Sequence, residues 1–493
     1  MRYQSTRDNS LNLTAAEAIA QGLSADGGLF VPDSFPHLTE DMIKDLASKP
    51  YKDRAARVLS LFLDDFSEEE LGRYTNDAYS GYDHPSVAPL YKLDENTRFL
   101  ELWHGPTCAF KDMALQMLPR LLTASLKKTG ETREVCILVA TSGDTGKAAL
   151  EGFADVPGTK IMVFYPRDGV SDVQKLQMTT QSGDNVNVVA VQGNFDDAQT
   201  GVKAIFSDEG LRTELDSRGY FLSSANSINW GRLVPQIAYY VSAYCDLLHD
   251  GTIKYGDEIN FCVPTGNFGN ILAGYYAKQM GLPIKKLICA SNRNDVLTEF
   301  IKTGVYDKNR PFFTTSSPSM DILVSSNLER LLFELSGKDG ALVSRYMTGL
   351  SNGGRYEIPD AVADEVRRVF AGGRCSEEDT LETIAEVFNK YNYLIDTHTA
   401  VAYKVLCDYR TQTGDETQAV VVSTASPFKF CDSVLKALGQ PHTGTEDKLI
   451  DMLAEASNCP APRPLAQLRG KTPRFGETVP IEGMTETVRG FLV

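Results

Sequence analysis

Val135-Cys-Ile-Leu-Val-Ala140 runs directly into Thr141-Ser-Gly-Asp-Thr-Gly146, which Lys147-Ala-Ala-Leu150 follows. The first six residues are an unbroken apolar run, which predicts a strand buried on both faces. The small and hydroxyl residues predict a loop, and the residues after them predict a helix. Strand, polar loop and helix form the unit of parallel α/β sheets. We therefore expect an α/β fold in which parallel sheets are flanked by helices.

The same arrangement recurs along the chain. Further apolar or β-branched runs are strand candidates: residues 160–166, 186–191, 259–264, 286–290 and 419–423. Helical patterns lie between them, such as 197–206 and 233–248. Because these strands are separated by helices and are not alternately polar, we expect them to lie in buried parallel sheets.

The regions before and after these strands have a different character. Residues 11–25 and 38–79 show helical spacing of apolar residues, and 29–32 predict a short extended piece. Prolines 85 and 89 indicate a boundary. We expect a helical N-terminal subdomain over 1–90, a body of two α/β lobes over 91–440 and a tail over 441–493 that packs on the body. Its part from 459 to 480, rich in Pro, Arg and Gly, predicts an extended path.

Composition excludes several classes of function. The chain has 493 residues and a formal net charge of -16, which disfavours a nucleic-acid partner because phosphate backbones are repelled. Its nine cysteines form no Cys-x-x-Cys pair and its six histidines show no His-x-x-x-His spacing, so we expect neither a disulfide scaffold nor a metal site. The N-terminal residues are polar, and no apolar run is long enough to span a bilayer. We expect a cytoplasmic protein with no membrane partner.

One lysine stands in unusual company. His104-Gly-Pro-Thr-Cys-Ala-Phe-Lys111-Asp112 places Lys111 among small and apolar residues. Such a setting weakens the hydration of the ammonium form and makes a neutral amine more accessible. A neutral lysine amine can form a Schiff base with an aldehyde, as pyridoxal phosphate enzymes require. By itself the segment also fits a solvated lysine at the start of a helix over 112–118.

Two strand-to-helix loops are candidates for anion binding. Ligands gather at the carboxyl ends of parallel strands, and the helix after each loop offers unpaired N–H groups. The loop 141–146 fits an anion site or a helix cap equally well. It is not a P-loop, because Thr141 stands at the first glycine position and Ala148 follows Lys147. The loop 264–270, with Gly266 and Gly269, fits a phosphate nest or a structural turn.

A third loop follows the last predicted strand as Ser423-Thr-Ala-Ser-Pro427. Its hydroxyl groups can face a ring nitrogen or cap the next helix. Taken together, the three loops and Lys111 offer an amine for an aldehyde, a phosphate nest, a second anion site and a hydroxyl donor. These groups match pyridoxal phosphate together with an anionic amino-acid substrate.

The combined motifs resemble the threonine synthase family, whose members are fold type II pyridoxal phosphate enzymes. The resemblance extends to about residue 430. It rests on His104-Gly-Pro-Thr-x-Ala-Phe-Lys111-Asp, Thr141-Ser-Gly-Asp-Thr-Gly, Asn226-Ser-Ile-Asn-Trp-x-Arg232, Gly266-Asn-Phe-Gly, Asp396-x-His398-Thr-Ala-Val and Ser423-Thr-Ala-x-Pro, and on Ile19-x-x-Gly22 to Pro32 for the N-terminal domain.

The resemblance implies conversion of O-phospho-L-homoserine and water to L-threonine and phosphate. Lys111 would be the catalytic Schiff-base lysine, and Thr424 would face the ring nitrogen. The cofactor phosphate would be held by Gly266, Asn267, Phe268, Gly269 and Asn270. Substrate groups would be bound by Ser142, Asp144, Thr145 and, as a phosphate clamp, Arg232. Arg232 fits a structural role as well, as an arginine tying a helix start to a carboxylate.

Two positions depart from the family pattern. Ser426 replaces a histidine that the family commonly carries, which questions the local geometry. Lys147 stands where the family often has a small residue. It fits a cation near a phosphate or a side chain in solvent, and we expect it to project into solvent. Two alternatives remain: a related pyridoxal phosphate lyase, such as a serine/threonine dehydratase or β-replacement enzyme, and a non-catalytic homologue that binds a phosphorylated ligand. A monomer or a homodimer is expected.

Overall fold

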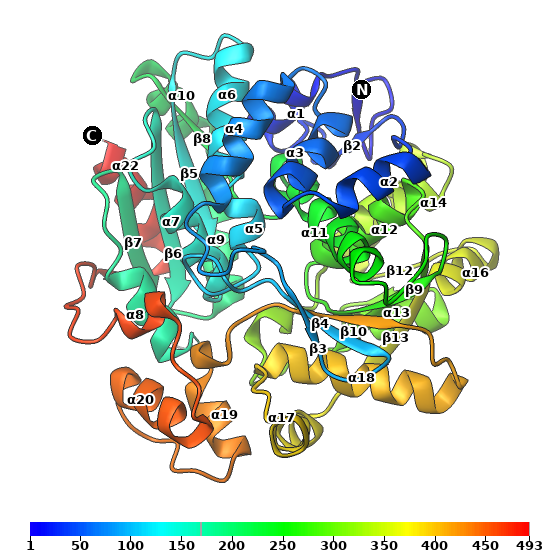
Figure 1. Cartoon of the computed structure of the whole chain (residues 1–493). Coiled ribbons are helices and arrows are strands. Elements are labelled where there is room, and N and C mark those ends of the chain that lie inside the picture. Colours follow the sequence, from blue (N-terminus) through cyan, green and yellow to red (C-terminus); the bar gives the residue numbers. More distant parts are fainter. Residues whose placement is uncertain (168–169, 493) are drawn as a thin grey trace.

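The computed structural model describes residues 1–167 and 170–492, and its first part is helical (Figure 1). The elements there are β1 (Tyr3–Ser5), α1 (Ala15–Gln21), β2 (Phe30–Pro32), α2 (Glu40–Ala47), α3 (Tyr51–Phe62) and α4 (Glu68–Tyr79). β1 and β2 pair antiparallel. Thr14, Thr39 and Ser67 start α1, α2 and α4, because each side chain accepts a hydrogen bond from the N–H three residues ahead.

The first lobe is built on a five-stranded parallel sheet of order β15-β7-β6-β5-β8. Its strands are β5 (Glu134–Ala140), β6 (Thr159–Pro166), β7 (Val186–Val191), β8 (Tyr220–Ser223) and β15 (Thr478–Val479). Alternate residues of β5 face two different cores. Ile137 joins a core with α7 (Asp144–Phe153), whereas Leu138 joins another with α9 (Phe195–Ser207) and α22 (Met484–Leu492). Burial on both faces is thus confirmed.

The second lobe contains a six-stranded sheet of order β13-β10-β9-β14-β4-β3. The strands are β3 (Leu90–Lys92), β4 (Thr97–Glu101), β9 (Ile259–Pro264), β10 (Ile284–Ser291), β13 (Phe370–Arg374) and β14 (Ala419–Ser423). All neighbours are parallel except β3 and β4. Val420 and Val422 face the core of α11 (Trp230–His249) and α12 (Gly269–Gln279), whereas Val421 faces that of α18 (Thr397–Thr413).

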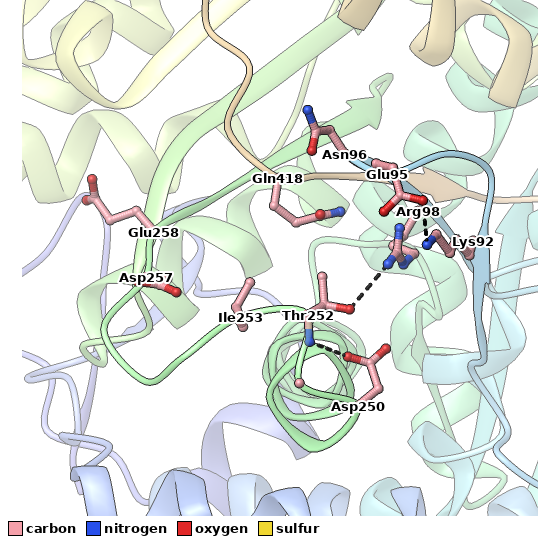
Figure 2. Close-up of a pocket in the computed structure, with 11 residues that line it drawn as sticks. Lys92, Glu95, Asn96, Arg98, Asp250, Thr252, Ile253, Asp257, Glu258 and Gln418 are labelled. Carbon is pink, nitrogen blue, oxygen red and sulfur yellow. Dashed lines mark hydrogen bonds and ion pairs between the residues drawn. The ribbon is translucent and has the colours of Figure 1, made fainter.

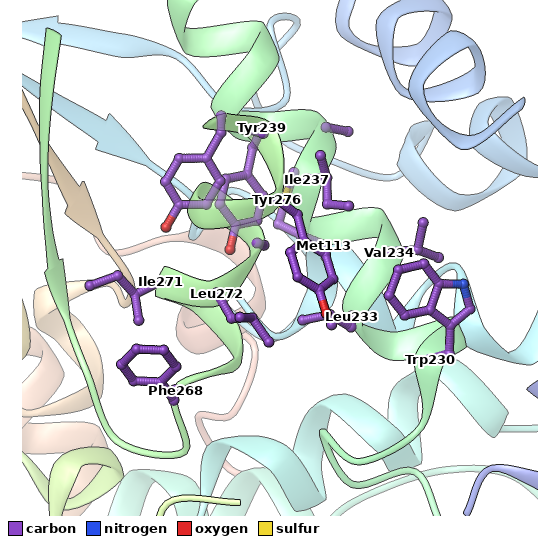
Figure 3. Close-up of a cluster of buried hydrophobic side chains, with 14 of the residues drawn as sticks. Met113, Trp230, Leu233, Val234, Ile237, Tyr239, Phe268, Ile271, Leu272 and Tyr276 are labelled. Carbon is purple, nitrogen blue, oxygen red and sulfur yellow. The ribbon is translucent and has the colours of Figure 1, made fainter. Parts of the chain in front are cut away.

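The N-terminal part and the second lobe share a continuous apolar core around Trp230. Figure 3 shows the side chains that α11 and α12 contribute to this core. The indole ring of this fully buried residue lies 5.3 Å from the ring of Tyr3, 5.7 Å from Phe62 and 6.0 Å from Tyr276. Aromatic rings at such distances pack favourably. α11 and α12 therefore stand on a rigid base, and the loops at their N-termini inherit that rigidity.

Several expectations about elements need correction. The helix expected over 11–25 is confined to α1, and the one expected over 112–118 is broken into α5 (Asp112–Leu115) and α6 (Leu118–Lys128). Part of the tail is regular: α20 (Glu446–Ser457) precedes the largely irregular stretch 459–480, which ends in β15 as a strand of the first sheet.

Candidate active site

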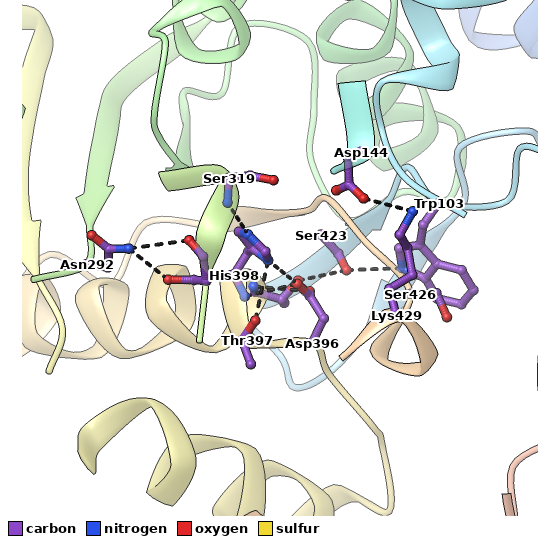
Figure 4. Close-up of polar contacts among 12 residues, drawn as sticks. Trp103, Asp144, Asn292, Ser319, Asp396, Thr397, His398, Ser423, Ser426 and Lys429 are labelled. Atoms are coloured by element: carbon purple, nitrogen blue, oxygen red, sulfur yellow. Dashed lines mark hydrogen bonds and ion pairs between the residues drawn. The ribbon is translucent and has the colours of Figure 1, made fainter. Parts of the chain in front are cut away.

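The loops after β4, β5, β9 and β14 all leave the carboxyl ends of their strands. β14 lies between β9 and β4, so their loops are neighbours. The loop after β4 is attached to the loop after β14: the Phe110 N–H donates to the Thr424 carbonyl at 2.8 Å, and the Ser426 N–H donates to the Cys108 carbonyl at 3.0 Å. Figure 4 shows Asp144 of the first lobe facing Lys429 of the second. The candidate site therefore lies between the lobes.

Lys111 is largely but not fully buried at this junction, and it is not a solvated lysine. It stands at the N-terminus of α5 with a side chain only 11% exposed, and its Nζ lies 4.4 Å from the centre of the Phe110 ring. Burial lowers the pKa of Lys111 to about 8, against the attraction of Asp144 and with help from the positive charges of Arg232 and Lys429. At pH 7 roughly a tenth of the amine is therefore neutral, far more than for a solvated lysine.

The loop after β9 forms a nest of backbone donors. The N–H groups of residues 266–270 donate to no acceptor in the described part of the chain. Phe268 adopts a left-handed conformation, with φ of 63°, immediately before α12. Because this turn and the first helical turn present their N–H groups to the same space, the loop can bind a phosphate dianion.

Side chains of the nest residues complete it. The Asn270 Oδ1 accepts hydrogen bonds from the hydroxyls of Tyr239 at 2.6 Å and Tyr240 at 2.8 Å, while its Nδ2 is buried and has no partner. Gly266 is required for space, because a Cβ there would lie 2.5 Å from the Ser319 carbonyl oxygen. A Cβ on Gly269 would meet its nearest atom only at 3.4 Å.

The nest is held from outside by a segment that follows β11 (Val305–Asp307). The Ser325 hydroxyl donates to the Gly266 carbonyl at 2.9 Å, and the Asn327 N–H and Nδ2 donate to the Asn267 carbonyl at 3.2 and 3.1 Å. The fully buried Arg330 donates to the Asn327 side chain, and also to the carbonyls of Phe30 and Ile228. The N-terminal part is thereby connected to the nest.

The loop after β5 is held mainly by its own first residue. The Thr141 hydroxyl accepts hydrogen bonds from the N–H groups of Gly143 at 3.0 Å and Gly146 at 2.8 Å. Within the described residues, the N–H groups of Ser142, Asp144 and Thr145 have no acceptor. They lie at the start of α7, so this loop too can bind an anion.

Asp144 places a charge in that loop. Its Oδ1 accepts hydrogen bonds from the Lys429 Nζ at 2.8 Å and the Gln174 Nε2 at 2.7 Å, and its Oδ2 lies 4.0 Å from the Lys111 Nζ. Burial alone would raise the pKa of Asp144, but Lys429, Lys111 and the hydrogen bonds hold it well below its usual value. The carboxylate is therefore ionised.

Arg232 approaches the same loop from the start of α11. Its Nη1 donates to the Ala225 carbonyl at 2.6 Å and its Nη2 to the Thr145 hydroxyl at 3.3 Å. It forms no ion pair with any carboxylate in the described ranges, and burial lowers its pKa to about 10. The prediction that Lys147 projects into solvent is wrong: it is buried and contacts Glu151 at 2.7 Å and Gln181.

The loop after β14 separates the two hydroxyl roles that its sequence left open. Ser426 caps the 3-10 helix η2 (Pro427–Lys429), since its hydroxyl accepts from the Phe428 N–H at 3.3 Å. Ser426 is fully buried, so replacing a histidine there leaves a well-formed turn. The Thr424 hydroxyl makes no hydrogen bond within the described residues.

Sequence reasoning missed Lys429, Asn327 and Arg330, and it missed the role of Thr141. Thr141 could have been found, because a hydroxyl residue that opens a Gly-rich loop often holds that loop. His398 belongs to one of the family motifs, but nothing in the sequence indicated its role. The His398 Nδ1 donates to Asp396 at 2.9 Å, and its Nε2 accepts from the Ser319 N–H at 3.3 Å. His398 thus holds Ser319 in place (Figure 4). The Ser319 carbonyl in turn lies against Gly266.

Other features of the described residues offer no rival site. No group of His, Cys, Asp and Glu among them could hold a metal ion, and no helix of the described ranges has the length and apolar character needed to cross a bilayer. All nine cysteines are unpaired. A polar hollow of about 470 Å³ (Figure 2) lies at the opposite, amino ends of β4, β9 and β14, where Lys92 pairs with Glu95 and Arg98 with Thr252.

Comparison with known families gives a consistent result. Residues 2–79 match the family described as threonine synthase N terminus, and 87–425 match the pyridoxal-phosphate dependent enzymes. Residues 399–470 match the family described as threonine synthase, C-terminal.

Individual relatives agree with the families. The threonine synthase of Pseudomonas aeruginosa is 40% identical and aligns with 97% of this chain and 99% of its own. Human threonine synthase-like 1 is 43% identical over 86% of this chain, which spans 58% of that longer protein. The structure of pyridoxal-phosphate-bound threonine synthase from Brucella melitensis is 38% identical, with a TM-score of 0.88 over 100% of this chain and 99% of that one.

Proposed function

This chain belongs to the threonine synthase family of pyridoxal-phosphate-dependent enzymes, and from that premise we propose how its residues divide the reaction. The reaction converts O-phospho-L-homoserine and water to L-threonine and phosphate, the last step of threonine biosynthesis. The observation that carries the assignment of roles is the buried Lys111 amine beside loops with unfilled backbone donors.

The residues present fit the cofactor. The nest at residues 266–270 has donors without acceptors, and the buried Asn270 Nδ2 has no partner, as a site for a phosphate group requires. Gly266, Asn267, Phe268, Gly269 and Asn270 would hold that phosphate. When bound, pyridoxal phosphate supplies an aldehyde for amines and a ring that accepts electrons from the substrate α-carbon.

Lys111 is the residue that moves protons. Its amine would carry the cofactor until substrate binds and then, as a neutral base, take the proton from the substrate α-carbon. The same amine would then move a proton at the neighbouring β-carbon as phosphate leaves from the γ-carbon. Water adds at the β-carbon, and protons return to the γ- and α-carbons. Its lowered pKa suits both directions of transfer near neutral pH.

The loop after β5 would bind the substrate. The N–H groups of Ser142, Asp144 and Thr145 suit its carboxylate, because they lack acceptors at a helix N-terminus. Arg232 would bind its phosphate, since a guanidinium without a carboxylate partner retains donors for a dianion. It lies at hydrogen-bonding distance from Thr145 and so belongs to the same pocket.

Thr424 would face the ring nitrogen. Its hydroxyl is not used elsewhere in the described chain, and Ser426 supplies the cap for the next turn. A hydroxyl, unlike a carboxylate, leaves a ring nitrogen largely unprotonated. Thr424 would therefore restrain competing reactions such as transamination.

Phosphate release from O-phospho-L-homoserine, followed together with threonine formation, tests the function. Equal amounts of phosphate and threonine are expected. A dehydratase would give a keto acid from serine or threonine, and a non-catalytic homologue would bind the substrate without releasing phosphate. Either result would overturn the proposed division of roles.

Reduction with borohydride tests the assignment of Lys111 independently of turnover. The reagent fixes the cofactor covalently on the lysine that carries it, and peptide mapping then identifies that residue. We expect the label on Lys111. A label on Lys429 or Lys147, the other buried lysines near the site, would contradict the assignment.

The division into residues 1–90, 91–440 and 441–493 is also proposed, supported by family matches that begin and end near the first boundary. Limited proteolysis should cleave first near residues 80–90 if the boundary holds. A cytoplasmic location and a monomeric or homodimeric state are likewise proposals, which cell fractionation and sedimentation test.

A further inference from the structure

Lys429 is a fully buried lysine at the floor of the site (Figure 4). It ends η2, directly after the loop that leaves β14. Its Nζ donates to the Asp144 carboxylate at 2.8 Å and to the Thr107 carbonyl at 2.9 Å. The first partner lies in the first lobe and the second lies in the segment that leads to Lys111. One ammonium group therefore joins three parts of the site.

Asp144 stands between two lysines. Lys429 and Gln174 donate to its Oδ1, and Lys111 lies 4.0 Å from its Oδ2. Lys429 has the closer and more buried ammonium group. It therefore attracts the carboxylate more strongly than Lys111 does, because ion-pair energy rises as distance and dielectric fall. Lys111 is left with a partner whose charge is already compensated.

The other charged groups that face Lys111 do not replace that partner. Arg232, from α11, is positive and repels its ammonium form. Asp112, from α5, accepts hydrogen bonds from the Thr107 N–H at 2.8 Å and hydroxyl at 2.7 Å, and burial raises its pKa to about 7. Asp144 is thus the carboxylate on which the charge state of Lys111 depends.

We propose that Lys429 is a positioning residue that binds Asp144 in a closed ion pair and thereby weakens the attraction of Asp144 for the Lys111 ammonium group, so that Lys111 loses its proton more readily and acts as a nucleophile and base. The lowered pKa of Lys111 agrees with this arrangement, since burial and the charges of Arg232 and Lys429 outweigh the attraction of Asp144. The inference rests on the proposed function only in taking Lys111 as the reactive lysine.

Competitive labelling of the full-length, cofactor-free protein tests the inference. Trace acetic anhydride reacts with neutral amines, so the acetylation of the Lys111 peptide against pH reports the fraction of neutral amine. In Lys429→Met, Asp144 keeps Gln174 but loses its closest cation, which leaves Lys111 as its charged partner, and we expect the Lys111 curve to move to higher pH by on the order of 1 unit. In the double variant Lys429→Met/Asp144→Asn, both charges are gone and the curve should return toward the wild-type position.

Lys147→Met is the matched control. It removes another buried lysine, which is paired with Glu151 and is not among the main groups that shift the pKa of Lys111, so the Lys111 curve should move little. Circular dichroism establishes that each variant is folded. An unchanged curve in folded Lys429→Met would overturn the inference. So would a double variant that keeps the shifted curve, because a packing effect does not reverse when the second charge is removed.

Failure of this inference and failure of the proposed function are distinguishable. If borohydride fixes the cofactor on another lysine, the proposed function loses Lys111 whatever the acetylation curves show. If the cofactor maps to Lys111 but the curves do not respond to the charges of Lys429 and Asp144, only the positioning role is lost.

Discussion

The loops after β9 and β5 share one local design and differ in charge. Each follows a buried parallel strand and opens a helix with unpaired N–H groups. The loop after β9 contains no acidic residue, whereas the loop after β5 contains Asp144, whose carboxylate is compensated by Lys429. The loop after β9, which has no acidic residue, suits a permanently bound dianion. The loop after β5, whose carboxylate is compensated by a lysine, suits a weaker and transient ligand.

The two loops also differ in what holds them. Ser325 and Asn327, from a distant segment, hold the backbone carbonyls of the loop after β9. Thr141 holds the loop after β5 from within, and the ion pair of Asp144 with Lys429 connects this loop to the other lobe. A cofactor site is thus preorganised by its surroundings, whereas a substrate site keeps its form through its own hydroxyl and one contact across the lobes.

Removing the amine that both loops serve should have the largest effect. We expect Lys111→Ala to lower turnover of O-phospho-L-homoserine on the order of 10³-fold, because proton transfer and covalent attachment are lost together. Binding of pyridoxamine phosphate should persist, since the nest remains. Steady-state kinetics and fluorescence titration measure the two. Turnover within tenfold of wild type would show that the loops serve another group.

Filling the nest comes next. Gly266→Ala places a Cβ against the Ser319 carbonyl, so the loop must shift, and we expect cofactor affinity to fall about 10- to 100-fold. Gly269→Ala is the control, because its Cβ has ordinary contact distances. Equilibrium dialysis with cofactor quantification compares them. Equal losses in both variants would mean that the two glycines do not differ as their surroundings indicate.

A change beside the loop after β5 should impair substrate binding but leave the cofactor site after β9 intact. Arg232→Gln should reduce kcat/KM for O-phospho-L-homoserine about 10- to 50-fold, the value of a lost charged hydrogen bond, and weaken inhibition by inorganic phosphate. Cofactor affinity should not change. Lys147→Gln serves as the control, since Lys147 is paired with Glu151. If phosphate inhibits Arg232→Gln as well as wild type, the substrate phosphate is bound elsewhere.

Loosening the outer support of the nest should have the smallest effect. Asn327→Ala removes the side-chain hydrogen bond to the Asn267 carbonyl and one acceptor of Arg330, but it leaves the backbone hydrogen bond to Asn267. We expect cofactor affinity to fall about fivefold, or about 1 kcal/mol. Isothermal titration with pyridoxal phosphate measures it, with Ser60→Ala in the N-terminal part as a remote control. A loss as great as that in Gly266→Ala would place the support, and not the glycine, at the centre of the nest.

The fold was predictable where strands are continuously apolar. β5, β6, β7, β9, β10 and β14 were all expected, and the parallel sheets are confirmed. β4 and β13 escaped prediction because their sequences carry charges or glycines. Gly372 of β13 lies in a tight contact, since a Cβ there would be 3.1 Å from the Thr298 Cα. Such a glycine weakens the sequence signal for a strand, although the residue that favours it, Thr298, lies on a helix elsewhere in the chain.

The candidate site was predictable where one short segment carries the chemistry. Lys111 and the two loops bear their own signals of burial, small residues and helix starts. Lys429 and Arg330 do not, because their partners lie far away in the sequence. Nothing in Pro427-Phe-Lys429 distinguishes a buried lysine from a solvated one, and only the arrival of Asp144 from the other lobe makes its burial favourable.

The pairing of β15 with β7 has a consequence for the growing polypeptide. β7 is synthesised long before residues 478–479, so the outer edge of its last residues, Ala190 and Val191, lacks a partner while residues 192–477 emerge. Exposed strand edges recruit other strands. Nascent chains arrested before residue 478 should therefore aggregate or occupy chaperones through β7, whereas chains that include β15 and α22 should not. Sedimentation of ribosome-bound chains of both lengths would reveal whether the late-arriving strand acts as the molecule's own protection against misassembly.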